Sequence, residues 1–205
     1  MMEYILTGVL AYLIGSIPSG LILGKLFWHT DLREHGSHNI GATNAWRTLG
    51  KVPGIIIFIA DSFKGQAGVL LGGMLVGTPL AAVIGGLFAI IGHSFSLFLR
   101  FRGGKGVATS LGVLTMLMGN VTFIVFVLWF TIVYMTRYVS LGSVIAGFLT
   151  PILAALFSYP MEYIVFSVIA AILVIVRHRE NIKRLMNGTE NKIQFMLLFG
   201  DWLSI

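Results

Sequence analysis

Residues 79–107 read PLAAVIGGLFAIIGHSFSLFLRFRGGKGV, an apolar stretch that ends in a cationic, glycine-rich turn. A transmembrane helix needs about 20 largely apolar residues to cross about 30 Å of hydrocarbon. Glycines let backbone N–H groups approach a ligand closely, and a turned run of such amides binds anions. Lys105 adds a positive charge, and the apolar run that follows offers a helix N-terminus. The stretch therefore predicts a membrane-spanning helix followed by a phosphate-binding turn, which we call the GGKG turn (residues 103–106).

The composition of the whole chain is that of a membrane protein. Of its 205 residues, 57% are hydrophobic and 11% are charged, whereas soluble domains carry about 25% charged residues. There is no cysteine, which excludes disulfides, thiolate catalysis and cysteine-based metal sites. No long polar stretch is present that would form a soluble domain. We expect one all-α integral membrane domain over residues 1–205.

About seven transmembrane helices are expected. The fourth and fifth are short and are separated only by Gly119 and Asn120, so a hairpin and one bent unit both remain open. The expected spans are residues 3–27, 53–77, 79–99, 106–119, 121–136, 144–158 and 161–177.

The basic residues predict the orientation of these spans. With seven spans, the segments 28–52, 100–105, 137–143 and 178–205 lie on one side of the membrane. All lysines and arginines except Lys64 fall in these segments or at the helix ends beside them. The positive-inside rule places these segments and the C-terminus in the cytoplasm and the N-terminus outside. The net charge of +6 is then a property of the cytoplasmic face, and it does not indicate a nucleic-acid partner.

The first basic segment is too long for a simple connection. It contains HTDLREHGSHNIGATNAWRTLGK at residues 29–51, in which Arg47 can grip an oxyanion with two N–H groups. Hydroxyls, amides and glycines surround it. A solvated loop held by Asx and Ser turns is an equal alternative. The candidate substrate-binding residues of this segment are Ser37, Asn39, Gly41, Thr43 and Asn44.

Gly103, Gly104 and Gly106 are the candidate substrate-binding glycines of the second segment, beside Lys105. The spacing of a Walker A loop is absent, so the GGKG turn alone is a weak signal. In the third segment, Ser140 and Ser143 stand near the start of the sixth span, as helix caps or as substrate contacts.

The fourth segment, residues 177–185, reads RHRENIKRL. Helical spacing puts Arg177, Asn181 and Arg184 on one face, with His178 beside Asn181. Part of this run is also typical of side chains that anchor a helix at the headgroup level.

Three ionisable residues are expected inside the spans. Asp61 and Lys64 are three residues apart, so they can pair on one face of a helix. Charges inside a membrane are costly, which makes the pair either a functional site or a structural ion pair. A hydrogen-bonded core residue is the favoured role for His93.

Four polar segments on one face, rich in cations and poor in carboxylates, suit an anionic substrate. No paired aspartate cluster is present, which disfavours two-metal phosphatases and magnesium-dependent phosphotransferases. We expect no metal and no cofactor. A site for phosphorylated molecules at a membrane surface implies that one reactant or product is a lipid.

The chain resembles the bacterial membrane glycerol-3-phosphate acyltransferases that use acyl phosphate as donor. The resemblance covers nearly the whole length, although Ser96 stands where the family pattern has a proline. It rests on six ordered blocks: YLIGSIPSG (12–20), GSHNIGATNAWRTLGK (36–51), DSFKG (61–65), FRGGKGVAT (101–109), RYVSLGS (137–143) and RHRENIKRL (177–185) with Gly188 and Glu190.

The resemblance implies transfer of a fatty acyl group from acyl phosphate to the 1-hydroxyl of glycerol 3-phosphate. The products would be lysophosphatidic acid and phosphate, the first committed step of phospholipid synthesis. The enzyme would lie among the lipids of a bacterial inner membrane with its active site facing the cytoplasm. No obligate protein partner is evident.

The residues agree with this activity, because two phosphorylated substrates need two anion sites. Lys105 in the GGKG turn forms one, and Arg47 with the first loop helps to form the other. His178 and Asn181 are expected to position glycerol phosphate, and Arg184 to contact substrate. His178 is also the best side-chain candidate for a base, but we favour a substrate phosphate oxygen as proton acceptor.

Three rival functions remain open at this point. A membrane anion or organophosphate transporter predicts polar groups in both halves of the membrane and inverted repeats, and the sequence shows neither. A non-catalytic assembly factor leaves the four polar segments unexplained. An acyltransferase that uses acyl-CoA is the nearest rival among enzymes.

Overall fold

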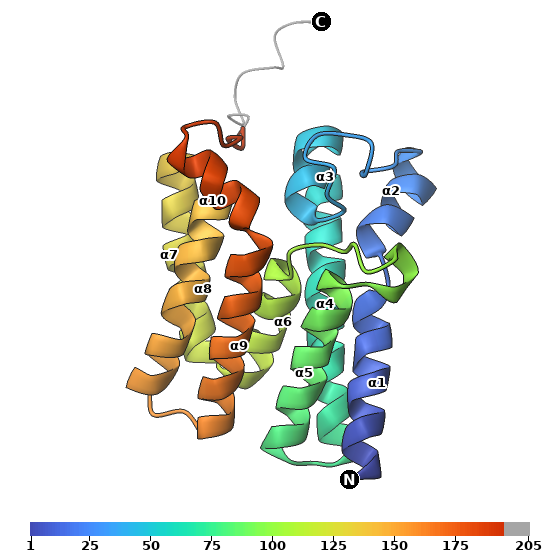
Figure 1. Cartoon of the computed structure of the whole chain (residues 1–205), viewed down its shortest axis with the longest axis vertical. Helices are drawn as coiled ribbons and strands as arrows, with labels where there is room; N and C mark the ends of the chain where they lie inside the picture. The colour runs from blue at the N-terminus through green and yellow to red at the C-terminus, as the bar shows by residue number, and fades with distance from the viewer. Residues whose placement is uncertain (195–205) are drawn as a thin grey trace, which may run out of the picture.

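The computed structural model describes residues 1–194 and is helical, with no strand in that range (Figure 1). The end of the expected segment 178–205, beyond residue 194, lies outside the described residues. The longer helices are α1 (Met2–Ser16), α4 (Lys51–Leu75), α5 (Pro79–Ser94), α6 (Val107–Leu117), α7 (Gly119–Thr136), α8 (Val139–Leu156) and α9 (Met161–Arg177). The shorter ones are α2 (Ser19–Trp28), α3 (Ala42–Leu49), the 3₁₀ turn η1 (Leu97–Leu99) and α10 (Arg179–Met186).

The expected spans all fall on these helices, and the all-α membrane fold is confirmed. By length and composition, five runs among the described residues can cross a membrane: Met2–Trp28, Lys51–Leu75, Pro79–Leu99, Gly119–Thr136 and Val139–Leu156. Helices α9 and α10, bent by 59°, pass the same test only together. At 1.5 Å per residue, α6 is about 17 Å long, too short to span alone. The count of seven and the orientation stay predictions.

Two of the expected spans are interrupted or shifted. The span 3–27 breaks at Pro18, which has no N–H to continue the α1 ladder, and α2 starts at the next residue. Helices α6 and α7 meet at Met118 and form a hairpin, so the alternative of one bent unit is wrong. Helix α8 begins at Val139, five residues before the expected start of that span.

Close contacts between small residues hold the helices together. A Cβ atom at Gly68 or Gly85 would overlap the backbone of the other, and one at Gly72 would overlap Ala81. Such contacts let α4 and α5 approach closely, as is typical of helices in lipid. Gly73 meets nothing within 4 Å and Gly77 lies in a turn with φ +76°, so these two glycines take no part in the packing.

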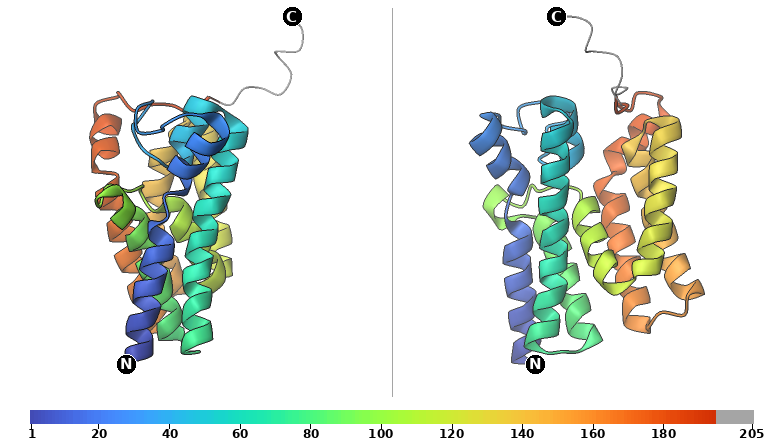
Figure 2. Two further views of the ribbon diagram at one scale, coloured as in Figure 1. Left: turned by 90° about the vertical axis from the view of Figure 1, so that its right-hand side faces the viewer. Right: turned by 180° about the vertical axis from the view of Figure 1, so that it is seen from behind.

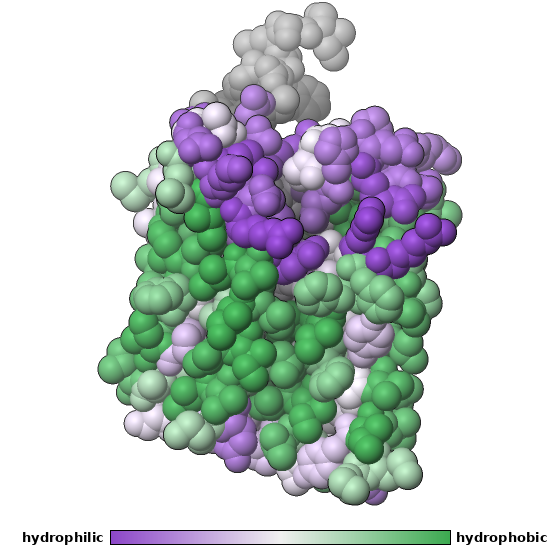
Figure 3. All heavy atoms as spheres, in the orientation of Figure 1, coloured by the Kyte–Doolittle hydropathy of each residue, from purple (hydrophilic) through white to green (hydrophobic). Residues whose placement is uncertain are grey.

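The helices form two groups, which are joined by α6 and by a direct contact between α5 and α9 (Figures 1 and 2). Helices α1, α4 and α5 pack together on one side and α7, α8 and α9 on the other, while α6 contacts α4 and α9. Hydrophilic side chains gather at the end that carries α2, α3 and α10, and apolar side chains cover most of the remaining surface in view (Figure 3). The N-terminus lies at the opposite end from this hydrophilic face.

Candidate active site

A cavity of about 370 Å³ opens among the polar segments. All of the predicted site residues line it except Gly103 and Gly104. Those that do are Ser37, Asn39, Gly41, Thr43, Asn44, Arg47, Lys105, Gly106, Ser140, Ser143, His178, Asn181 and Arg184. They come from the loop before α3, from α3, α8 and α10, from the junction between α9 and α10, and from the turn before α6. The fold thus brings together residues that are separated by up to 147 positions in the chain.

Lys105 is held by a partner in α10, far along the chain. Its Nζ atom donates a hydrogen bond of 2.6 Å to Oδ1 of Asn181 in α10. The pKa of Lys105 is lowered to about 8, mainly by burial and also by the nearby cations Arg184, Arg47 and Arg177, although the charge of Glu190 opposes the shift. The cavity therefore concentrates positive charge, which favours an anionic ligand.

Glu190 is the site residue that sequence reasoning did not select. Its Oε1 accepts hydrogen bonds from Asn181 Nδ2 (2.6 Å) and Ser140 Oγ (2.8 Å), and its Oε2 pairs with Arg184 Nε at 2.8 Å. Burial by itself raises the pKa of Glu190, but these three donors together lower it below its usual value. A lone carboxylate among cations, nine residues after Asn181, was the available signal.

Arg47 in α3 keeps part of its guanidinium group free. Nη2 donates 2.7 Å to the carbonyl of Asn191, whereas Nε is buried and has no hydrogen-bond partner among residues 1–194. A buried N–H group of an ion without a partner is costly. Arg47 itself lines the cavity, so its guanidinium group is placed to meet an anionic ligand.

Asn44 organises the first loop around itself. Its Nδ2 donates to the carbonyls of Leu32, His35 and Asn39 at 2.8–3.0 Å, and its Oδ1 accepts the amide of Ser37 at 2.8 Å. The side chain is 2% exposed. These contacts use the whole amide group, so Asn44 shapes the loop, and the Asx turn considered as an alternative is present at Asn39, whose Oδ1 accepts the amide of Gly41.

The GGKG turn differs from the expected arrangement. The amide of Gly103 donates to the carbonyl of Ser94 (3.2 Å) and the amide of Gly104 to that of His93 (3.0 Å), so neither faces a ligand. This corrects the expectation that these two amides bind anions. The turn instead presents the Lys105 side chain and the N-terminus of α6, which starts after Gly106 with φ +81°.

Arg177 fixes the GGKG turn from the opposite side. Its Nη2 and Nε donate to the carbonyls of Gly103 (2.8 Å) and Gly104 (3.1 Å). The turn is thus held between the end of α5 and the end of α9. Arg177 is therefore more than the headgroup anchor that its position suggested.

The two serines of α8 do not cap it, because the helix begins before them. Ser140 binds Glu190, as described above. Ser143 Oγ donates to the Val139 carbonyl (2.9 Å) and accepts a hydrogen bond from Trp129 Nε1 (3.2 Å). Tyr138 occupies the N-cap position without a side-chain hydrogen bond, so the capping alternative is wrong.

His178 stands between α9 and α10, with its ring against the backbone. Nδ1 lies 2.7 Å from the carbonyl of Val174, which can only accept, so Nδ1 carries the hydrogen and Nε2 is the free nitrogen. Burial, and after it the charge of Lys105, lowers the pKa of His178 to about 4. The imidazole is neutral at pH 7 and a weak base.

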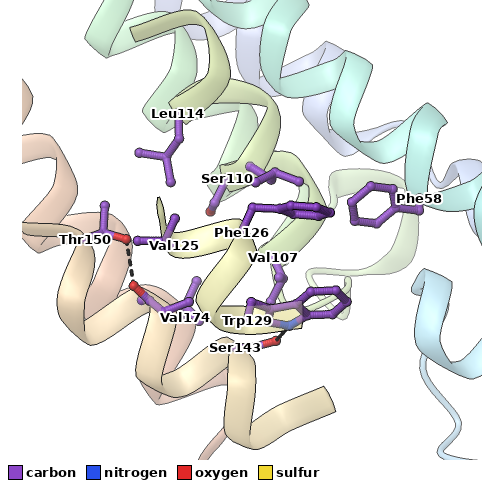
Figure 4. A pocket seen from close by; sticks show the side chains of 13 residues that line it. Phe58, Val107, Ser110, Leu114, Val125, Phe126, Trp129, Ser143, Thr150 and Val174 are labelled. Atoms are coloured by element: carbon purple, nitrogen blue, oxygen red, sulfur yellow. Dashed lines mark hydrogen bonds between the residues drawn. The ribbon is translucent and has the colours of Figure 1, made fainter. Parts of the chain in front are cut away.

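A second cavity of about 80 Å³ extends the site into the apolar interior (Figure 4). It shares Phe58, Val107, Phe126, Trp129 and Ser143 with the larger cavity. Deeper, it is lined by Leu114, Thr150, Val174 and other mainly apolar residues. The polar cavity therefore adjoins an apolar one between α4, α6, α7, α8 and α9.

The ion pair expected inside the second span is present. Nζ of Lys64 lies 2.7 Å from Oδ1 of Asp61, and Nδ1 of His93 lies 3.5 Å from the same oxygen. Asp61 and His93 also line the cavity. Within residues 1–194, no group of three or more His, Asp and Glu side chains is placed to hold a metal ion.

Comparison with known proteins finds one family over nearly the whole chain. The family model described as "Glycerol-3-phosphate acyltransferase" matches residues 5–188. Proteins of that name from Carboxydothermus hydrogenoformans and Bacillus subtilis are 46% and 43% identical to this chain, over 92% of it and 96% of their own length in each case.

Two solved structures have the same fold. Both are crystal structures of PlsY (YgiH), an integral membrane glycerol 3-phosphate acyltransferase. The glycerol 3-phosphate form is 37% identical, with a TM-score of 0.88, over 93% of this chain and 96% of that one. The lysophosphatidic acid form is 35% identical, with a TM-score of 0.86, over 93% and 95%.

Proposed function

The chain belongs to the glycerol-3-phosphate acyltransferase family, and on that premise we propose that it transfers a fatty acyl group from acyl phosphate to the 1-hydroxyl of glycerol 3-phosphate. The products are lysophosphatidic acid and inorganic phosphate. We place the reaction at the cytoplasmic face of a bacterial inner membrane, because the hydrophilic end of the molecule carries the basic segments.

One observation carries the proposal: a cation-rich cavity adjoins an apolar one. Lys105, Arg47 and Arg184 line the polar cavity, and Glu190 is the carboxylate that its neighbours already bind. The apolar cavity between the helices suits the start of a fatty chain. An acyl carbonyl at the boundary would lie next to two phosphate groups, as the reaction requires.

The bonds that form and break all lie within the two substrates. The 1-hydroxyl oxygen attacks the acyl carbonyl carbon, a C–O ester bond forms, and the C–O bond to phosphate breaks. Positive charge from Lys105 or Arg47 stabilises the phosphate that leaves and the oxyanion that develops. The hydroxyl proton goes to an oxygen of the donor phosphate, because the low pKa of His178 makes its imidazole a poor base.

His178 and Asn181 are proposed to position glycerol 3-phosphate. The free Nε2 of His178 can accept a hydrogen bond from a hydroxyl of glycerol, which orients it without removing its proton. Asn181 connects Lys105 to Glu190, so it fixes the cation that faces the substrate.

The donor is tested with the purified protein in detergent, labelled glycerol 3-phosphate, and either acyl phosphate or acyl-CoA. We expect labelled lysophosphatidic acid, together with equimolar phosphate release, with acyl phosphate only. Product with acyl-CoA alone would overturn the donor. If neither donor gives product, the transporter alternative is favoured. Uptake of labelled glycerol 3-phosphate into proteoliposomes then tests it.

A further inference from the structure

A buried polar cluster lies beneath the GGKG turn and is not used by the mechanism above. In this cluster, Asp61 and Lys64 of α4 meet His93 of α5, and all three are less than 9% exposed. Lys64 Nζ lies 2.7 Å from Asp61 Oδ1 and 3.3 Å from His93 Nδ1. The imidazole is therefore held through Nδ1, and its Nε2 edge is turned away from the ion pair.

The same cluster joins the break between α1 and α2. Lys64 Nζ donates 2.8 Å to the carbonyl of Ile17, which lies at the break between the two helices and also accepts the Ser19 amide at 2.9 Å. Ser19 Oγ donates to Asp61 Oδ1. Three elements are tied to one ion pair, so the cluster is rigid, and charges kept inside a membrane at such cost point to a function.

The GGKG turn rests directly on His93. Besides the hydrogen bond from the Gly104 amide to the His93 carbonyl, the Cα of Gly104 faces the imidazole so closely that a Cβ there would overlap Nε2. A Cβ at Gly103 would overlap the His93 carbonyl. The next residue is Lys105, whose Nζ reaches the cavity. The position of the His93 imidazole thus sets the position of the turn that carries Lys105.

We propose that Asp61, Lys64 and His93 are positioning residues. Asp61 and Lys64 hold the His93 imidazole in place, the GGKG turn packs against it, and this contact places Lys105 beside a substrate phosphate. The proposal rests on the function proposed above. A structural ion pair that only packs α4 against α5 would not require the imidazole to touch Gly104. Misplacing a catalytic group by about 1 Å costs roughly 100-fold in rate, so this contact has a measurable consequence.

A double-mutant cycle between Gly104 and His93 tests the contact. Gly104→Ala puts a methyl group against Nε2, and because φ at Gly104 lies outside the left-handed region, alanine meets the imidazole and not backbone strain. We expect Gly104→Ala to reduce kcat/KM about 100-fold, and His93→Ala about 10-fold, mainly by raising KM for a phosphate substrate. His93→Ala/Gly104→Ala should be more active than Gly104→Ala alone. If the activity losses of the two single variants instead multiply in the double variant, the proposal is overturned.

Hydrogen exchange of the GGKG turn gives a readout that does not depend on activity. Asp61→Asn/Lys64→Gln removes both charges and strands neither of them in the membrane. We expect faster amide exchange at residues 100–106 than in the wild type, with unchanged exchange in α8 and a higher KM for the phosphate that Lys105 holds. Unchanged exchange and KM in this variant would overturn the proposal.

Ser167→Ala is the matched control, because Ser167 is also buried but bonds only the Ile164 carbonyl of its own helix. Ser167→Ala should change neither the amide hydrogen exchange of residues 100–106 nor kcat and KM. If His93→Ala does not fold, His93→Gln keeps a polar side chain and tests the same contact with Gly104→Ala. If the wild type itself transfers no acyl group, the proposed function fails, while the exchange data still decide the positioning role.

Discussion

Lys105 Nζ and Asn181 Oδ1 are joined by a hydrogen bond of 2.6 Å between residues 76 positions apart. The bond connects the turn before α6 to α10 across the polar cavity. On the other side of Asn181, Glu190 accepts a hydrogen bond from Asn181 Nδ2 and forms an ion pair with Arg184. The cation that we propose faces the substrate is thus oriented by a chain of three side chains, Asn181, Glu190 and Arg184.

Replacement of Lys105 tests the phosphate contact. Lys105→Ala is expected to lose at least about 100-fold in kcat/KM, because a charge-assisted contact to a phosphate disappears. The protein should remain folded, as judged by gel filtration in detergent beside Ser167→Ala. Near-normal turnover in Lys105→Ala would remove Lys105 from the site.

The lowered pKa of Lys105 predicts a pH dependence. Burial lowers the value to about 8, so the fraction of charged lysine in the free enzyme falls as the pH rises above 8. KM for the phosphate that Lys105 holds should therefore rise, by up to tenfold per pH unit well above that value. Lys105→Arg keeps its charge and should show a flat profile between pH 7.5 and 9.5, which steady-state assays at fixed donor can check. A wild-type KM that stays flat over this range contradicts the assignment.

Arg47 is expected to need its guanidinium geometry and not only its charge. Its Nη2 is used by the Asn191 carbonyl while its buried Nε is free. Lysine cannot make both contacts, so Arg47→Lys should lose about tenfold and Arg47→Ala most of the activity. Initial rates at varied concentrations of each substrate identify which KM rises. Equal activity of Arg47→Lys and wild type would rule out a geometric role.

Glu190 is expected to be structural as well as functional. Glu190→Gln replaces one acceptor oxygen by an NH2 group among three donors, at a cost of about 2–4 kcal/mol. The lowered pKa also sets a pH window. Because the folded value lies below 4.5, the stability from this carboxylate is present above pH 4.5 and is lost as the pH falls further. Thermal unfolding from pH 3.5 to 7 should show this loss in the wild type and not in Glu190→Gln.

The orientation can be measured directly because the chain has no cysteine. Thr189→Cys lies at the hydrophilic end, and Ser158→Cys lies in the connection between α8 and α9; both positions are exposed. In intact cells, an impermeant maleimide should label Ser158→Cys only, and in inverted vesicles Thr189→Cys only. The cysteine-free parent gives the background. Labelling in the reverse order would place the active site outside.

The helical spans were predictable from the sequence because each depends on a local property, the run of apolar residues needed to cross hydrocarbon. The ends of the helices were less predictable. Helix α8 begins at Val139, earlier than hydropathy indicated. The reason is that Ser140 and Ser143 are polar residues but are buried against Glu190 and Trp129. The hairpin at Met118 depends on how α6 packs against α4 and α9, and no single segment specifies that.

The types of residue in the site were also readable, since phosphate recognition needs cations, hydroxyls and amides on one face of the membrane. Their individual roles were not. The amides of Gly103 and Gly104 looked free in the sequence, and only the fold shows that His93 and Ser94 use them. Glu190 was passed over because its three partners lie 6 to 50 residues away.

Composition, apolar runs and charge bias by themselves determined that this is a helical membrane protein with its cations gathered in a few polar segments, because those properties add up residue by residue along the chain. The tertiary structure alone decided which groups are free to bind. A hydrogen bond or an ion pair joins atoms that the sequence keeps far apart, so the placement of Lys105, the free Nε of Arg47 and the seat formed by His93 exist only once α4, α5, α9 and α10 are packed together.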